Sequence, residues 1–177
     1  INKATNISID YSAPENQRAE LQKGEEKQIH WLTRAFNDSV DIPTEVAFAF
    51  KTINYNGLNI LLQPGKKLVL VLAIESKFKN KTPLKYVQEA IKKINENTVE
   101  KSLHLHNKWW DTYWDKSSLT IEDPVLMKSY YQGLYTMAAC SRDPEFPPGI
   151  FGWTTTDTPA WNGDYHLNYN FQAPFYG

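Results

Sequence analysis

The chain has 177 residues, of which 41% are hydrophobic and 22% charged, and its 19 basic and 20 acidic side chains leave a net charge of -1. This length excludes a complete (β/α)8 barrel, which needs about 250 residues, and a closed ring of a dozen helices, which needs roughly 200 or more. The balanced charge predicts no binding to nucleic acid. Apolar runs such as Leu68 to Ile74 are too short for a bilayer, so no membrane span is predicted.

Residues 1–78 show the period-two pattern of β-strands. Alternation is visible in Lys27 to Phe36 and again in Glu45 to Ile53. In the first run, Ile29 and Trp31 are predicted on one face, and the other face is predicted to carry His30, Leu32 and Phe36. The residues expected on one face of the second run are Val46, Phe48 and Phe50.

Two turn signals divide the rest of this β part. Asn56-Gly57 lies between apolar residues and predicts a hairpin, because both residues tolerate positive φ. A second turn, Gln63 to Lys66, leads into the run Leu68 to Ile74. Because this run has no polar alternation, it predicts a strand covered on both faces. Such a strand needs a second layer, so the β part is expected to belong to a larger sandwich.

After Phe78 the apolar residues follow the 3.6-residue period of helices. Thr82 before Pro83 predicts a helix start, and Asp123-Pro124 predicts another that runs to about Ser141. The first helix has an apolar stripe of Leu84, Val87, Ile91 and Ile94. A helix between these two carries Val99, Leu103, His106, Trp110 and Trp114 on one face. Prolines and glycines over 143–160 predict a long loop.

Aromatic residues crowd the C-terminal part of the chain. Five of the six Trp, seven of the ten Tyr and four of the eight Phe lie in the last 73 positions. Trp109 to Trp114 is interpreted first as helix packing, although dense exposed rings also suit the apolar C–H face of a sugar. His104 and His106 lie two apart on a helix and point in different directions. With a single cysteine, Cys140, and no zinc spacing, no metal or cofactor is predicted.

The segment Trp161 to Gln172 mixes amide, carboxylate, imidazole and phenol groups with aromatic rings. A hydrophobic core would leave so many polar groups unsatisfied. The composition therefore favours a cleft that hydrogen-bonds a polyol or orients a water, while an ordinary exposed loop stays open as the alternative. Asp164 is the carboxylate of this segment. Asn168 and Asn170 are two apart and can share a side only if the chain turns there.

The order of these features resembles glycoside hydrolases that join a β-sandwich, a helical linker and an (α/α)6 barrel. The resemblance covers residues 58–177 and is strongest to family 95, the inverting α-L-fucosidases, and more distant to family 65, disaccharide phosphorylases and hydrolases. Its most specific element is Trp161-x-x-x-Tyr165-x-x-Asn168-x-Asn170, which is similar to the W-x-x-x-Y-x-x-N-x-N segment of the sugar subsite of family 95.

The resemblance implies a multidomain chain, β then α. Residues 1–78 would be the C-terminal part of the β-sandwich, 79–117 the helical linker and 118–177 the start of the (α/α)6 barrel, which is incomplete here. The glutamate acid and the aspartate that complete the family's site are expected beyond Gly177. The 177 residues alone are therefore expected to be inactive, with the remainder of the same enzyme chain as their partner.

The resemblance also implies roles for particular residues. Asn168 and Asn170 would position and activate the attacking water. The residues expected to bind substrate, an oligosaccharide or glycoconjugate, are Trp153, Trp161, Asp164, Tyr165 and His166. Family habit places such enzymes in the periplasm or outside the cell.

Two departures weaken the link to fucose in particular. Gly152-Trp153-Thr154 lacks the asparagine of the usual Gly-Leu-Trp-Asn, and Ala173 to Tyr176 replaces Met-Asn-Tyr-Trp. Two alternatives stay open. One is a family 65-like disaccharide phosphorylase, and the other is a non-catalytic carbohydrate-binding fragment.

Overall fold

The computed structural model shows β structure followed by helices, as predicted. It describes residues 3–15, 17–37, 41–145, 147–150 and 160–176. The chain divides into two compact units, Ile1–Trp109 and Trp110–Gly177, called here the β unit and the C-terminal unit. This division falls inside a helix, and the predicted boundaries at 78 and 117 stay predictions.

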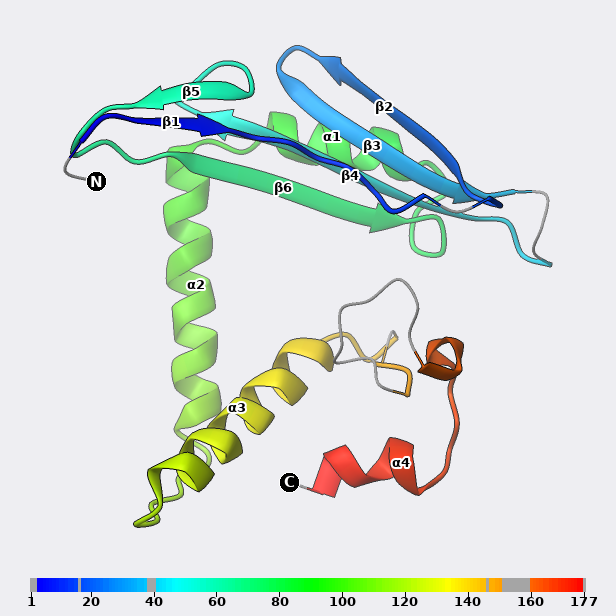
Figure 1. The fold of residues 1–177 in the computed structure, drawn as a ribbon, viewed down its shortest axis with the longest axis vertical. Coiled ribbons are helices and arrows are strands. Elements are labelled where there is room, and N and C mark those ends of the chain that lie inside the picture. The colour runs from blue at the N-terminus through cyan, green and yellow to red at the C-terminus, as the bar shows by residue number, and fades with distance from the viewer. Residues whose placement is uncertain (1–2, 16, 38–40, 146, 151–159, 177) are drawn as a thin grey trace. The chain divides into compact units, whose positions relative to one another are not determined.

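Six strands are found in the described residues of the β unit (Figure 1). They are β1 (Thr5–Ser8), β2 (Glu20–Glu26), β3 (Ile29–Phe36), β4 (Thr44–Ile53), β5 (Asn59–Leu62) and β6 (Val69–Ser76). One sheet has the order β2-β3-β4-β6 and the other pairs β1 with β5, and every pairing is antiparallel.

The core of the β unit lies between the four-stranded sheet and helix α1 (Pro83–Lys92). Val87 and Ile91 of α1 are fully buried, as are Ala47 and Ala49 of β4, and Ile29 of β3 joins the same cluster. The two alanines have small side chains, which lets the helix approach the sheet closely. Figure 1 shows α1 behind this sheet. The predicted apolar stripe of the helix and the alternation of both strands are confirmed.

The opposite face of the same sheet is open along β6, although Phe50 and His30 on that face are buried beside Tyr11. Leu70, Leu72 and Ile74 of β6 are 45%, 57% and 65% exposed, whereas the intervening Val71 and Ala73 pack against the core. The prediction that this strand is covered on both faces is therefore wrong for the structure described. The side chains of β6 are apolar on both sides, but within this strand only Val71 and Ala73, on the side that faces α1, pack against the core.

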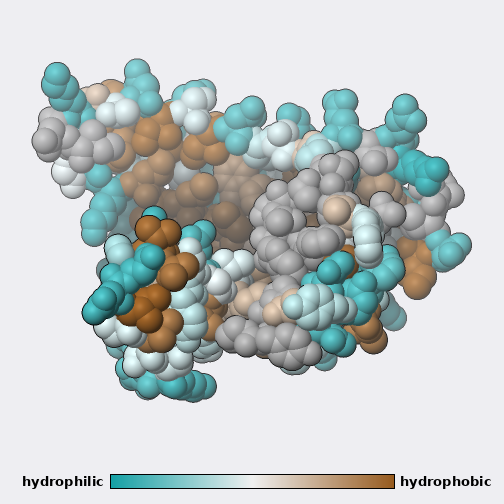
Figure 2. Space-filling model, turned by 60° about the horizontal axis from the view of Figure 1, so that its bottom comes forward, coloured by the Kyte–Doolittle hydropathy of each residue, from teal (hydrophilic) through white to brown (hydrophobic). Residues whose placement is uncertain are grey.

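Hydrophobic side chains gather over this part of the molecule in Figure 2. The open face contains a hollow of about 640 Å³, lined in part by Tyr11, Arg34 and Phe48. Tyr11 packs edge-on against Phe50, with ring centroids 4.9 Å apart. Burial raises the pKa of the Tyr11 hydroxyl, and the carboxylates of Glu25 and Asp10 add to this shift.

The turns were predicted with mixed success. Gln63 to Lys66 is a turn, closed by a 3.1 Å hydrogen bond from Lys66 N to Gln63 O. Gly57 lies in a bend with a φ of 76°, but the predicted hairpin is wrong, because β4 pairs with β3 and β6 while β5 pairs with β1. The tight hairpin is instead β2–β3, where Lys27 and Gln28 adopt φ of 51° and 64°.

Two long helices follow, α2 (Glu96–Trp114) and α3 (Pro124–Cys140). The predicted start of α3 is confirmed: the Asp123 carboxylate accepts hydrogen bonds from Val125 N and Leu126 N at 2.8 and 3.1 Å. Thr82 is at the N-cap of α1, as predicted, but makes no side-chain capping bond. The C-terminal unit ends in short turns, η1 (Ala160–Gly163), α4 (Tyr169–Gln172) and η2 (Ala173–Tyr176).

Candidate functional site

Aromatic rings join the end of α2 to α3 within the C-terminal unit. Trp110 stacks on Tyr135 with centroids 5.0 Å apart, and on Trp114 at 5.5 Å. The Tyr113 hydroxyl donates a 3.1 Å hydrogen bond to the Leu134 carbonyl oxygen. These rings contact one another across the helix pair, so the first interpretation, packing, holds for them. The predicted site residues lie instead in the segment that follows α3.

Two stretches of backbone lie side by side in that segment. The amide of Ile150 donates a 2.8 Å hydrogen bond to the Asp164 carbonyl oxygen. The Tyr165 hydroxyl donates a 2.7 Å hydrogen bond to the Pro147 carbonyl oxygen. Ile150 is fully buried. The proline-rich stretch, which the sequence marked only as a helix breaker, therefore fixes the backbone of the polar segment.

Gly149 makes this close approach possible. A Cβ at Gly149 would overlap the Gly163 carbonyl oxygen and lie 3.2 Å from the Asp164 carbonyl oxygen. Only glycine leaves room for the two backbones at this point. Gly149 is not among the predicted site residues, and its place after two prolines is the only signal that the sequence offers for it.

Asn168 marks a turn of the chain at the start of α4. Its backbone is extended, with φ of −116° and ψ of −176°, and its side-chain oxygen accepts from the Phe171 amide at 3.3 Å. Asn170 follows inside α4 and is exposed. The spacing of the two asparagines left open whether the chain turns there. In the structure it does turn between them.

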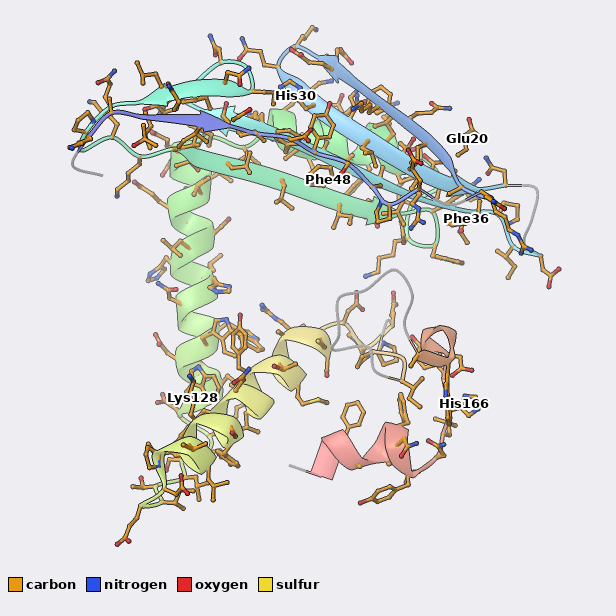
Figure 3. All side chains as sticks on the ribbon, viewed as in Figure 1. Glu20, His30, Phe36, Phe48, Lys128 and His166 are labelled. Atoms are coloured by element: carbon orange, nitrogen blue, oxygen red, sulfur yellow. The ribbon has the colours of Figure 1, made fainter. Side chains whose placement is uncertain are left out.

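The imidazole of His166 is held by two neighbours. Its Nδ1 lies 2.6 Å from Asp164 Oδ1, and each of these side chains is about half exposed. The Trp161 indole meets the His166 ring edge-to-face, with centroids 5.3 Å apart. Figure 3 shows His166 on the extended segment between η1 and α4. Trp161 itself has a φ of 55°, in the left-handed region that non-glycine residues seldom occupy.

The predicted site residues therefore fall into two groups. Trp161, Asp164 and His166 contact one another. Tyr165 belongs to the second group, since its ring meets Phe171 of α4, whose amide Asn168 caps. Trp153 lies outside the described residues. The described residues contain no cluster of three or more His, Cys, Asp or Glu side chains that could bind a metal ion. None of the helices described is both long and apolar enough to cross a bilayer.

Residues 81–177 match the sequence model of the Glycosyl hydrolase family 95 catalytic domain. The chain belongs to glycosyl hydrolase family 95. The family 95 match includes α1 to α4 and with them every predicted site residue. The resemblance to family 95 is thereby confirmed, while the more distant one to family 65 stays a prediction.

Two curated fungal proteins are similar to this family 95 chain. "Probable alpha-fucosidase A" of Aspergillus niger is 29% identical over 118 residues, a stretch that covers 54% of this chain and 15% of the relative. The protein of the same name from Aspergillus oryzae is 39% identical over 57 residues, which is 31% of this chain and 8% of the relative. The chain thus spans a small part of these relatives. No solved structure matches it.

Proposed function

We propose that this chain is part of an inverting glycoside hydrolase that removes a terminal α-linked sugar, as an α-L-fucosidase does. Membership in family 95 and the names of the two fungal relatives support the substrate class. The observation that carries the mechanism is the turn at Asn168, which starts α4 two residues before Asn170.

Asn168 and Asn170 are the groups proposed to hold the attacking water. An amide carbonyl oxygen has two lone pairs. The Asn168 oxygen uses one for the Phe171 amide, at 3.3 Å, which leaves the other for a water. Capping also restrains the Asn168 side chain before the water arrives. Asn170 is exposed on α4 and supplies the second amide.

The aromatic side chains nearby suit the apolar face of a sugar. Trp161 is 54% and Tyr165 58% exposed, although the Trp161 carbonyl oxygen accepts from Asp164 N and the Tyr165 hydroxyl donates to the Pro147 carbonyl oxygen. Rings with this exposure offer surface for stacking. Asp164 and His166 supply polar groups beside them. We propose this surface as part of the binding site for an oligosaccharide or glycoconjugate.

Inversion requires two catalytic groups about 6.5–9.5 Å apart, on opposite sides of the sugar. In the proposed enzyme this chain contributes the water-holding side. The general acid and the aspartate that assists the asparagines would come from the remainder of the enzyme. Neither Asp164 nor any other acidic residue of the chain is assigned to those roles.

Product analysis of the complete enzyme tests the reaction. Proton NMR of the sugar released from an α-L-fucoside should show the β-anomer first, with no sugar phosphate when phosphate is added. Retention of configuration would contradict the proposal, and a sugar phosphate would favour the family 65-like reaction.

A double variant tests the two asparagines. Asn168→Ala with Asn170→Ala should lower kcat by roughly 100- to 1,000-fold, the range for loss of a positioned polar group. Asn107→Ala, at an exposed position of α2, is the matched control and should leave kcat unchanged. Turnover of the double variant equal to that of the control would remove the asparagines from the mechanism.

We also propose that residues 1–78 are the C-terminal part of a β-sandwich, that 79–117 are a helical linker and that 118–177 begin an (α/α)6 barrel. The exposed apolar side chains Leu70, Leu72 and Ile74 support the sandwich, because soluble proteins seldom leave so large an apolar face uncovered.

Leu72→Lys should leave the stability of the 177-residue chain unchanged and lower the melting temperature of the complete enzyme. Equal effects in both would argue against a covering layer.

A further inference from the structure

We propose that Asp164 is a positioning residue that selects the tautomer of His166. The carboxylate holds the proton on His166 Nδ1, so that Nε2 is left as a hydrogen-bond acceptor for a sugar hydroxyl. This inference rests on the proposed function, which makes the segment a sugar site, and adds to it the direction of one hydrogen bond and the residue that sets it.

The contact between the two side chains determines the position of the proton. His166 Nδ1 lies 2.6 Å from Asp164 Oδ1, a short hydrogen bond. An ionised carboxylate can only accept, so Nδ1 must be the donor. In the neutral imidazole the other nitrogen, Nε2, then carries a lone pair and no proton. Isolated imidazole side chains are under no such constraint.

The carboxylate can act in this way because its own backbone is held. The Asp164 carbonyl oxygen accepts from Ile150 N at 2.8 Å, and its amide donates to the Trp161 carbonyl oxygen at 3.4 Å. Tyr165, the next residue, is tied to Pro147 through its hydroxyl. The Asp164 backbone is therefore fixed by two hydrogen bonds of its own, and the side chain of the next residue is tied to the 147–150 stretch as well.

The imidazole has a second restraint in the ring of Trp161. The two rings meet at 64° with centroids 5.3 Å apart, so the indole limits rotation of the imidazole about its side-chain bonds. With Nδ1 on the carboxylate and Trp161 against the ring, Nε2 is the nitrogen available to a ligand.

This arrangement specifies the chemistry of the ligand. An unprotonated Nε2 needs a donor, and a sugar hydroxyl is one. The half-exposed indole of Trp161 provides an apolar surface beside it for the C–H groups of the same sugar. We therefore expect discrimination against sugars in which the hydroxyl facing His166 is replaced by hydrogen or fluorine, because neither substituent can donate a hydrogen bond to Nε2.

Nitrogen NMR of the 177-residue chain tests the tautomer directly. With 15N-histidine labelling there are four imidazoles to resolve, and His166→Gln identifies the signal of His166. At a pH where the ring is neutral, Nδ1 should carry the proton, and Asp164→Ala should shift the balance toward the Nε2–H form. Asp115→Ala is the matched control and should leave the signal unchanged. A proton on Nε2 in the unaltered chain would overturn the proposal.

Kinetics of the complete enzyme test the consequence. Asp164→Ala should raise KM by about 10-fold, the equivalent of one hydrogen bond, with a smaller change in kcat. Asp164→Asn, whose carbonyl can still accept from Nδ1–H, should recover part of the loss, and it replaces the alanine variant if that fails to fold. A series of deoxy sugars should include one that loses affinity for the unaltered enzyme but not for Asp164→Ala.

The two proposals fail separately. If the complete enzyme releases no sugar while His166 carries its proton on Nδ1, the proposed function is wrong and the tautomer assignment stands. If the enzyme is an active glycosidase but Asp164→Ala leaves KM and the deoxy-sugar pattern unchanged, Asp164 has no positioning role.

Discussion

The two units of the chain are held together in different ways. In the β unit, Val87 and Ile91 of α1 and Ala47 and Ala49 of β4 are fully buried in one apolar cluster. In the C-terminal unit, α3 has no buried side chain, and among its described residues full burial is confined to the loop around Ile150. Burial of apolar surface stabilises the first unit, whereas ring stacking and backbone hydrogen bonds position the second.

The largest expected effect comes from the core of the β unit. Ile91→Ala should lower the free energy of unfolding by about 2–5 kcal/mol, the cost of removing buried methyl groups and leaving a cavity. Leu126→Ala, at a residue of α3 that is 59% exposed, is the matched variant and should change it by less than about 0.5 kcal/mol. Hydrogen exchange of the β3 and β4 amides measures the effect of Ile91→Ala. Hydrogen exchange of the α3 amides measures the effect of Leu126→Ala. Equal effects would erase the contrast between the units.

The next effect is predicted for the loop of the C-terminal unit. Gly149→Ala should destabilise the pairing of residues 147–150 with 161–165 by about 1–3 kcal/mol, because the new methyl group has no space. Gly133→Ala is the control, since apart from the adjoining residues and backbone of α3 no atom of the described residues lies within 4 Å of the added Cβ. It should stabilise that helix by about 0.5–1 kcal/mol. The readout is loss of protection of the Ile150 amide from hydrogen exchange. Unchanged protection in Gly149→Ala would contradict the close approach of the two backbones.

A helix cap should contribute more to stability in α3, which has no buried side chain, than in α1, which has a buried face. Asp123→Ala removes two hydrogen bonds at the start of α3 and should cost about 0.5–2 kcal/mol. Thr82→Ala at the start of α1 should cost less, because Thr82 makes no capping bond and α1 is held by its buried face. Thermal unfolding followed by circular dichroism compares the two variants. A larger loss in Thr82→Ala would show that the cap assignment is wrong.

The smallest effect concerns a surface ion pair on α1. Glu89 and Lys92 are 2.7 Å apart. Hydrogen bonding to Lys92 lowers the pKa of Glu89 below 4.5, and the same bond raises the pKa of Lys92 above 10.5. The stability that Glu89 contributes to the folded chain is present above pH 4.5 and is lost as the pH falls through its lowered pKa. The stability that Lys92 contributes is lost as the pH rises through its raised pKa.

Glu89→Gln should therefore lower the melting temperature slightly near neutral pH and have no effect in acid. Melting curves at about pH 7 and about pH 3 measure the difference. The effect should be far smaller than that of Ile91→Ala because both charged groups are exposed to solvent. A deficit of equal size at both pH values would show that the ion pair is not its cause.

Helix starts and apolar stripes could be predicted because they depend on neighbours in the sequence. Asp123 caps the amides two and three residues further on, and Val87 and Ile91 are one helical turn apart. The motif that contains Asn168 and Asn170 was also visible in the sequence, and it lies within the residues that match family 95. Each of these signals is local, so no knowledge of distant contacts was needed.

Other features depend on which segments meet in space. Asn56-Gly57 predicts a turn, but whether the flanking strands pair with each other depends on the other strands available, and here β5 pairs with β1. Lys27-Gln28 forms the tight hairpin without glycine or asparagine, because the pairing of β2 with β3 imposes the positive φ values. The run Leu68 to Ile74 cannot reveal from its residues alone that one side would face α1 and the other would be open.

The sequence alone determined the order of β and helical parts, the starts and stripes of the helices, and the polar segment that resembles a family 95 motif. The tertiary structure decided how strands pair, which face of β6 is buried, and that Gly149 brings the backbone of 147–150 against Asp164. It also decided that Asp164, His166 and Trp161 form one contact group. The physical reason is range: hydrogen bonds to nearby amides and helical periodicity act within a few residues, whereas packing and the approach of two backbones depend on residues far apart in the sequence.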